Sequence, residues 1–126
     1  TTKQLWQCLA RENIAVLVTV PTLLFRLLHE PPPDDSAHPK AEHLQLNKII
    51  CGSAPLNPAL CERVQKRFQK HCGPVLYNLY GTTETGVISV ATPMQLLAHP
   101  ATVGRVLRGI HLTVQQGQLY LSGRSG

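Results

Sequence analysis

Two short segments of the sequence combine small, hydroxyl-bearing and acidic residues in a way that packing alone does not require. The first, Cys51 to Leu56, reads CGSAPL, and the second, Asn78 to Gly86, reads NLYGTTETG. Small residues let the backbone approach a ligand closely, while Tyr80 offers a stacking face and Glu84 a hard oxygen ligand for Mg²⁺. Thr82 and Thr83 add hydroxyls that can bind phosphate. Taken singly, each segment is equally typical of an ordinary polar turn.

Each segment follows a short apolar run that we expect to form a strand. Lys48–Cys51 precedes the first segment, and residues 75–79 lead into the second. An earlier run, Ile14–Val18, does not alternate, which predicts a strand covered on both faces, as in a parallel sheet. Because the carboxyl ends of parallel strands open on one edge, we expect both segments to lie at the same edge of the sheet.

Three predicted helices alternate with these strands, over residues 3–12, 21–30 and 58–71. The third has the clearest boundaries, since Asn57 can cap it, Pro58 suits its first position, and Gly73 followed by Pro74 ends it. Alternating helices and strands predict an α/β fold with a mostly parallel sheet and flanking helices.

The pattern changes after Gly86. Strands are predicted at 87–91, 103–114 and 118–121, the last two joined by a turn at 115–117. We expect residues 1–86 to form an α/β part, and residues 87–126 an incomplete β-rich continuation that begins an antiparallel element.

Composition limits the classes of protein to consider. The chain has 126 residues, 43% hydrophobic and 15% charged, which is typical of a globular protein, and its apolar runs are too short to cross a membrane. The net charge is +5, but the densest basic group, around Arg63 and Arg67, falls on the polar side of a predicted helix without interleaved aromatics. We therefore expect no nucleic-acid partner.

No pair among the four cysteines has metal-site spacing, which favours reduced, mostly buried thiols in a cytosolic protein.

Together the two segments resemble motifs of the adenylate-forming superfamily, which includes acyl- and aryl-CoA ligases, luciferases and the adenylation domains of peptide synthetases. Its central signature YGxTE is matched by Tyr80 to Glu84, and GSAPL at 52–56 resembles the family's loop at the acyl and adenine pocket. The segment 15–28, with VPT at 20–22, and the VGR and QLYL stretches at 103–105 and 118–121 also resemble family strands, in the right order.

The resemblance implies a role for each matching residue. Tyr80 and Gly81 would pack on adenine, and Asn78 would contact its edge. Thr83 would bond the α-phosphate and Glu84 would ligate Mg²⁺, which makes these two the expected catalytic residues. The residues expected to bind the nucleotide are Gly52, Ser53, Ala54, Asn78, Tyr80, Gly81, Thr82 and Thr83.

The implied cofactors are ATP, Mg²⁺ and CoA. In the family a carboxylate attacks the α-phosphate to give acyl-AMP and pyrophosphate, and a thiol then displaces AMP. We favour a CoA ligase, because peptide-synthetase adenylation domains usually carry Pro where Thr82 stands and a more acidic loop at 52–56. An amino-acid adenylation domain and a non-enzymatic interaction domain remain alternatives. The expected location is the cytoplasm, or the membrane periphery if the acid is a fatty acid.

The resemblance also implies parts that this sequence lacks. The family's Lys-containing phosphate loop should lie upstream, and its ribose-binding Asp and mobile C-terminal domain should lie beyond residue 126. We therefore expect the chain to be a slice of a larger N-terminal domain, inactive alone. Its expected partners are ATP or AMP, a carboxylic acid and the remainder of a parent enzyme.

Overall fold

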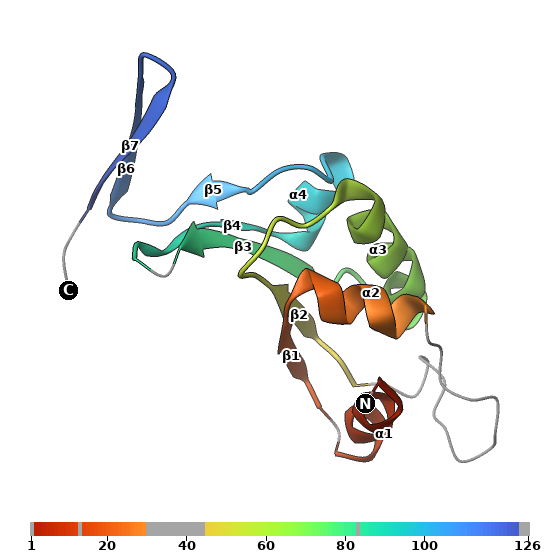
Figure 1. Ribbon diagram of the computed structural model, residues 1–126. Coiled ribbons are helices and arrows are strands. Elements are labelled where there is room, and N and C mark those ends of the chain that lie inside the picture. Colours follow the sequence, from red (N-terminus) through yellow and green to blue (C-terminus); the bar gives the residue numbers. More distant parts are fainter. Residues whose placement is uncertain (1, 13, 30–44, 83, 124–126) are drawn as a thin grey trace.

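A computed structural model describes residues 2–12, 14–29, 45–82 and 84–123 (Figure 1). The elements in chain order are α1 (Thr2–Arg11), β1 (Val16–Thr19), α2 (Pro21–His29), β2 (Lys48–Cys51), α3 (Pro58–Cys72), β3 (Leu76–Thr82), β4 (Gly86–Ala91), α4 (Pro93–Ala98), β5 (Arg105–Val106), β6 (Ile110–Gln115) and β7 (Gln118–Gly123).

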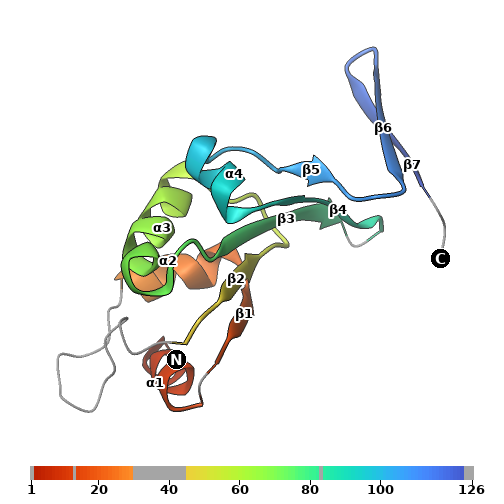
Figure 2. The ribbon, with the colours of Figure 1, turned by 180° about the vertical axis from the view of Figure 1, so that it is seen from behind.

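The strands form two sheets. The larger has the order β1-β2-β3-β4-β5, with β1, β2 and β3 parallel and with β4 and β5 added antiparallel. The other sheet is the hairpin β6–β7, which extends away from the larger sheet in both views (Figures 1 and 2). The predicted fold class, a mostly parallel α/β sheet followed by an antiparallel element, is confirmed.

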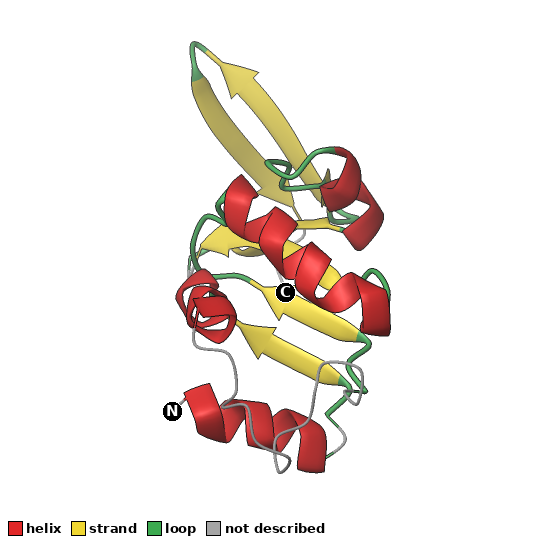
Figure 3. Ribbon diagram, turned by 90° about the vertical axis from the view of Figure 1, so that its right-hand side faces the viewer, coloured by secondary structure: helices red, strands yellow, loops and turns green. Residues whose placement is uncertain are grey.

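The helices pack against one face of the larger sheet and build the core there. α3 crosses the strands, and α1 lies beside the β1 edge (Figure 3). Trp6 of α1 and Phe68 of α3 are fully buried, with ring centroids 6.1 Å apart, and Leu24 and Ile49 complete the contact between α2, α3 and β2. This single core holds the carboxyl ends of β2 and β3 in place.

Among the described residues nothing covers the opposite face of the sheet, which differs from the expectation for Ile14–Val18. Burial alternates along β1, so that Leu17 is buried whereas Val16 and Val18 are 45% and 72% exposed. The non-alternating sequence predicted cover on both faces. Within the described residues, however, the helices pack on only one of them.

The helix boundaries largely follow their local signals. Asn57 Oδ1 accepts a hydrogen bond from the N–H of Ala59 at 2.8 Å, and Gly73 has the positive φ of +77° that ends α3. α2 starts at Pro21, as predicted, and ends at His29, whereas the predicted end, residue 30, lies outside the described residues. None of the described helices is long and apolar enough to span a membrane.

Two features after Gly86 differ from expectation. The strand predicted over 103–114 is divided into β5 and β6 by a turn in which Gly109 has φ +90°. The helix α4 was not predicted, although Thr92 and Gln95 form a capping box at its start. Its brevity, six residues, left the apolar periodicity too short to detect. The turn at 115–117 is present, with positive φ at Gln116 and Gly117.

Candidate functional site

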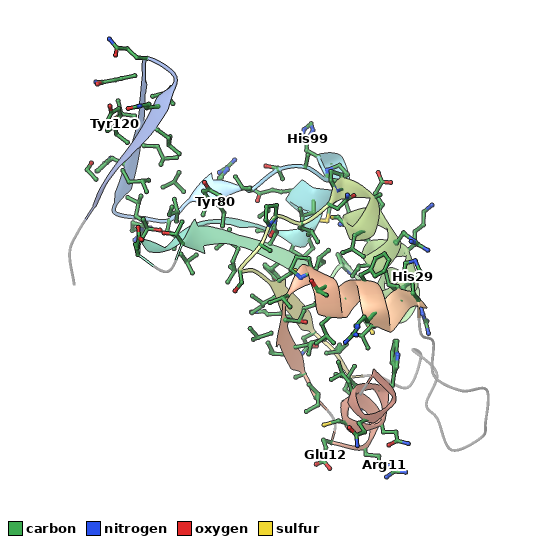
Figure 4. All side chains as sticks on the ribbon, viewed as in Figure 1. Arg11, Glu12, His29, Tyr80, His99 and Tyr120 are labelled. Atoms are coloured by element: carbon green, nitrogen blue, oxygen red, sulfur yellow. The ribbon has the colours of Figure 1, made fainter. Side chains whose placement is uncertain are left out.

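The two chemistry-bearing segments meet at the end of β2 and β3, where two clefts adjoin. The smaller, about 240 Å³, is lined by Ser53, Ala54, Pro55, Leu56, Asn78, Leu79, Tyr80, Gly81, Ala101 and Val103. The larger, about 550 Å³, is lined by Val18, Thr19, Ile50, Gly52, Ser53, Leu79, Tyr80, Gly81, Thr82, Gly86 and Val87. Tyr80 borders both and lies far from Tyr120 on the hairpin (Figure 4). The expected meeting of the segments at one sheet edge is therefore present.

The loop after β2 is anchored at both ends. The N–H of Gly52 donates to Thr19 O at 3.1 Å, which extends the β1–β2 pairing, and the Asn57 cap begins α3. Between these anchors Ser53 adopts φ +72°, a left-handed conformation that L residues with a Cβ rarely occupy. Backbone strain of this kind is often found at ligand sites.

Gly81 has a packing reason to be glycine as well as the expected ligand contact. The register of β3 against β4 shifts between Tyr80 and Gly81, and Gly81 then pairs with Val87. A Cβ on Gly81 would collide with the backbone carbonyl of Gly86. The close approach of these two strands therefore excludes any side chain at this position.

Asn78 carries an unmet hydrogen-bonding need inside the smaller cleft. Its side chain is only 5% exposed, and Oδ1 has no hydrogen-bond partner among the described residues. Leaving a buried acceptor unpaired costs about 1–3 kcal/mol, so such a group is expected to find a donor. Asn78 is at the same time one of the residues that line this cleft.

The acidic end of the second segment lies outside both clefts. Glu84 is exposed in the turn between β3 and β4 and lines neither cleft. Thr82 lines the larger cleft, and its hydroxyl oxygen lies 2.8 Å from that of Thr85. The expected role of Thr83 concerns a residue outside those described.

Both clefts are neutral as far as the described residues are concerned, since none of the side chains that line either one is charged. Behind the site, burial raises the pKa of the Cys51 thiol to about 11, with a smaller contribution from Cys61. Cys51 is therefore a protonated core residue and not a nucleophile. Among the described residues no three His, Cys, Asp or Glu side chains gather to hold a metal. Mg²⁺ bound together with phosphates needs only one or two carboxylates, so Glu84 alone fits that requirement.

Sequence reasoning missed the contribution of the α4–β5 segment to the smaller cleft. Ala101 and Val103 line it, and Ser89 Oγ donates to Val103 O at 2.7 Å, which holds this segment against β4. Gly104 allows the approach, because a Cβ there would collide with the Val90 carbonyl. The VGR stretch was visible in the sequence, but nothing local indicated that it faces Asn78.

Comparison with known proteins decides the family. The model of the family described as AMP-binding enzyme matches residues 1–123, nearly the whole chain. The chain belongs to this AMP-binding enzyme family. Among curated proteins, none matches the sequence significantly.

Solved structures of this family's fold resemble the chain closely. A benzoate CoA ligase from Burkholderia xenovorans LB400 superimposes with a TM-score of 0.75 at 20% identity, over 98% of this chain and 26% of that one. The amide bond synthetase McbA from Marinactinospora thermotolerans gives 0.72 at 23% identity, over 98% and 26%. The o-succinylbenzoate CoA synthetase from Bacillus subtilis, in complex with its acyl-adenylate intermediate, gives 0.71 at 18% identity, over 98% and 25%.

These likenesses establish the fold. The chain spans about a quarter of the length of each of these structures.

Proposed function

We propose that this chain forms the adenine- and acid-binding edge of an ATP-dependent carboxylic acid–CoA ligase. Such an enzyme joins the acid to AMP and then transfers the acyl group to the thiol of CoA. The observation that carries the proposal is the buried, unpartnered Oδ1 of Asn78 in a neutral cleft beside Tyr80.

Adenine matches the chemistry of the smaller cleft. Its exocyclic amino group is an N–H donor of the kind that Asn78 Oδ1 lacks, and its ring can stack on Tyr80, which is 41% exposed. Ser53 and Ala54 form the opposing wall with little side-chain bulk. The absence of charge from the lining suits a neutral base, whose phosphates would extend outward.

The larger cleft is suited to the body of the acid. Val18, Ile50, Leu79 and Val87 give it apolar walls on the open face of the sheet. Because it shares Tyr80 and Gly81 with the smaller cleft, an acid bound there would place its carboxylate near the nucleotide. Holding the acid and the nucleotide side by side would supply a large part of the rate enhancement of acyl-AMP formation.

Glu84 and Thr83 are proposed to act on the phosphates. Glu84 would hold Mg²⁺, and the hydroxyl of Thr83 would donate to the α-phosphate. When bound, the metal neutralises charge that develops on the phosphates. The carboxylate of Glu84 is exposed at the turn next to the larger cleft and is free to meet a phosphate-bound metal.

CoA as the thiol acceptor and the cytoplasm as the location are further parts of the proposal. Two of the similar structures are a benzoate CoA ligase and a CoA synthetase. Cys51 and Cys61 are free thiols, which is typical of reducing compartments.

The adenine assignment is tested by nucleotide preference. AMP and IMP differ at position 6 of the base, where AMP carries an amino donor and IMP a carbonyl. We expect the 126-residue chain to prefer AMP, and Asn78→Leu to lose about 10-fold in AMP affinity while affinity for IMP stays unchanged. Isothermal titration calorimetry measures both affinities. Asn47→Leu, at an exposed asparagine outside the clefts, is the matched control.

The outcomes separate the possibilities clearly. An equal loss for both nucleotides in Asn78→Leu would show general damage to the cleft, and would contradict the proposed contact. If the wild-type chain binds neither nucleotide at millimolar concentration, the proposed function is wrong.

The metal role requires the full-length protein that carries this chain. Glu84→Gln keeps the shape but removes the charge, so adenylation should fall by at least ~100-fold, the order observed when one electrostatic stabiliser is lost. Thiol transfer from synthetic acyl-AMP should suffer much less, because no pyrophosphate charge then needs neutralising. Equal losses in both half-reactions would make Glu84 a structural residue.

A further inference from the structure

The turn between β3 and β4 is closed by two threonine hydroxyls. The N–H of Thr85 donates to Thr82 Oγ1 at 3.0 Å, and the N–H of Thr82 donates to Thr85 Oγ1 at 3.1 Å. The two hydroxyl oxygens lie 2.8 Å apart. This reciprocal pattern across three residues is that of a capping box, found here outside a helix. We call the pair the Thr82–Thr85 clasp.

The clasp accounts for both hydroxyl protons. Each threonine hydroxyl has one proton to donate. The Thr85 hydroxyl also lies 3.1 Å from the Gly86 carbonyl, and when it donates there the proton between the two hydroxyl oxygens comes from Thr82. A phosphate oxygen needs a donor. In that arrangement the Thr82 hydroxyl has no proton left to offer one.

We propose that Thr82 and Thr85 are positioning residues that fix the turn carrying Glu84, next to Thr82 and Gly86 of the larger cleft. The Thr82 hydroxyl thus serves the turn and not a phosphate, and Thr85 becomes a residue of the site although it lines neither cleft. The inference rests on the proposed function as far as the role of Glu84 in metal binding is concerned.

The physical advantage is preorganisation of the carboxylate. Glu84 is exposed, and its side chain would otherwise have to be ordered together with its backbone when the metal binds. Ordering a rotamer-rich side chain costs about 0.5–1.5 kcal/mol, and an unfixed backbone adds to this cost. Hydrogen bonds that already hold Thr82 and Thr85 together leave less to be fixed when the metal binds.

The test compares Mg²⁺-dependent with metal-independent nucleotide binding in the 126-residue chain. Thr85→Val removes the hydroxyl with little change of shape, and should lower affinity for ATP in the presence of Mg²⁺ by about 10-fold relative to affinity for AMP alone. Thr85→Ser keeps the hydroxyl and should restore the ratio. Thr82→Val should match Thr85→Val, and the double variant should be no worse than either, because the two act as one unit. Thr113→Val, at an exposed threonine of β6, is the control.

A direct spectroscopic measurement examines the clasp without any ligand. Amide hydrogen exchange of Thr82, followed by NMR, should accelerate by about 10-fold or more in Thr85→Val and return in Thr85→Ser. Unchanged exchange would overturn the clasp.

The remaining outcomes separate this inference from the proposed function. If Thr82→Val weakens binding of ATP with Mg²⁺ but Thr85→Val does not, the Thr82 hydroxyl meets a phosphate directly and the inference is wrong. If the wild-type chain binds AMP and no variant changes the ratio, the clasp has no positioning role while the proposed function stands. If the chain binds neither nucleotide, the proposed function fails and the positioning role is overturned with it.

Discussion

The strands of the larger sheet and of the β6–β7 hairpin both carry apolar side chains, yet these side chains have very different surroundings. In the sheet, Leu76 and Ile49 are fully buried beneath the helices. In the hairpin, Leu112, Val114 and Leu119 are 41%, 70% and 49% exposed. Apolar residues in a strand therefore help to identify the strand, but not whether something covers its apolar face.

The register of the hairpin gathers its exposed apolar side chains on one face. Leu112 pairs with Leu121 and Val114 with Leu119 on one face, whereas Thr113 pairs with Tyr120 on the other. A two-stranded hairpin alone is marginal in water. All members of the buried core cluster lie between Trp6 and Leu96, so the stability of the described structure resides around the candidate site and not in the hairpin.

Matched leucine substitutions test this contrast most strongly. Leu76→Ala should lower the free energy of unfolding by about 2–5 kcal/mol, because the side chain is fully buried and leaves a cavity. Leu119→Ala, on an exposed strand position, should change it by less than about 0.5 kcal/mol. Urea denaturation followed by far-UV circular dichroism measures both. Comparable losses would mean that the hairpin packs against a part of the core, and the contrast would be wrong.

The same contrast explains what the sequence could reveal about the fold. Residues with local physical causes were predictable: Pro21 and Asn57 start helices, and Gly73 ends one. Cover on the second face of β1 was expected, yet Val16 and Val18 are exposed within the described residues, because cover depends on what packs there and not on the two side chains themselves.

For the site, the meeting of the two segments followed from the parallel topology alone. The place of Ala101 in the smaller cleft could not be predicted, because it depends on how a distant segment packs against β3. The Thr82–Thr85 clasp could not be predicted either, because it depends on the exact backbone path of the turn. The position of Glu84 outside both clefts was equally invisible to motif reasoning.

Alkaline pH should weaken the core but not the hairpin. Burial raises the pKa of the Cys51 and Cys61 thiols from 9.0 to about 11. Between these values the unfolded chain loses protons that the folded chain keeps, so the free energy of unfolding is unaffected below pH 9 and falls toward pH 11. The expected loss is on the order of 2 kcal/mol per thiol.

Denaturation curves at pH 8, 9, 10 and 11 measure this slope. Cys61→Ala should be less stable at every pH but lose about half of the slope, whereas Cys8→Ser, at an exposed thiol, should retain it. An identical slope in wild type and Cys61→Ala would assign the alkaline effect to other groups.

The smallest expected effects concern two residues with positive φ, one in each region. Ser53, in the site loop, has φ +72°, and Gln116, in the hairpin turn, has φ +51°. Ser53→Gly should raise the free energy of global unfolding by up to about 1 kcal/mol, since relief of left-handed strain exceeds the entropy that glycine adds to the unfolded chain. Gln116→Asn creates the Asn-Gly pair favoured in tight hairpin turns, and should slow local amide exchange in β6 and β7 by a few-fold without changing global unfolding. Both variants are measured by urea denaturation and by amide hydrogen exchange. Ser53→Gly should change global unfolding, whereas Gln116→Asn should change only local exchange in the hairpin. A global stabilisation by Gln116→Asn would show that the hairpin unfolds cooperatively with the sheet, and the separation between the two regions would then have to be abandoned.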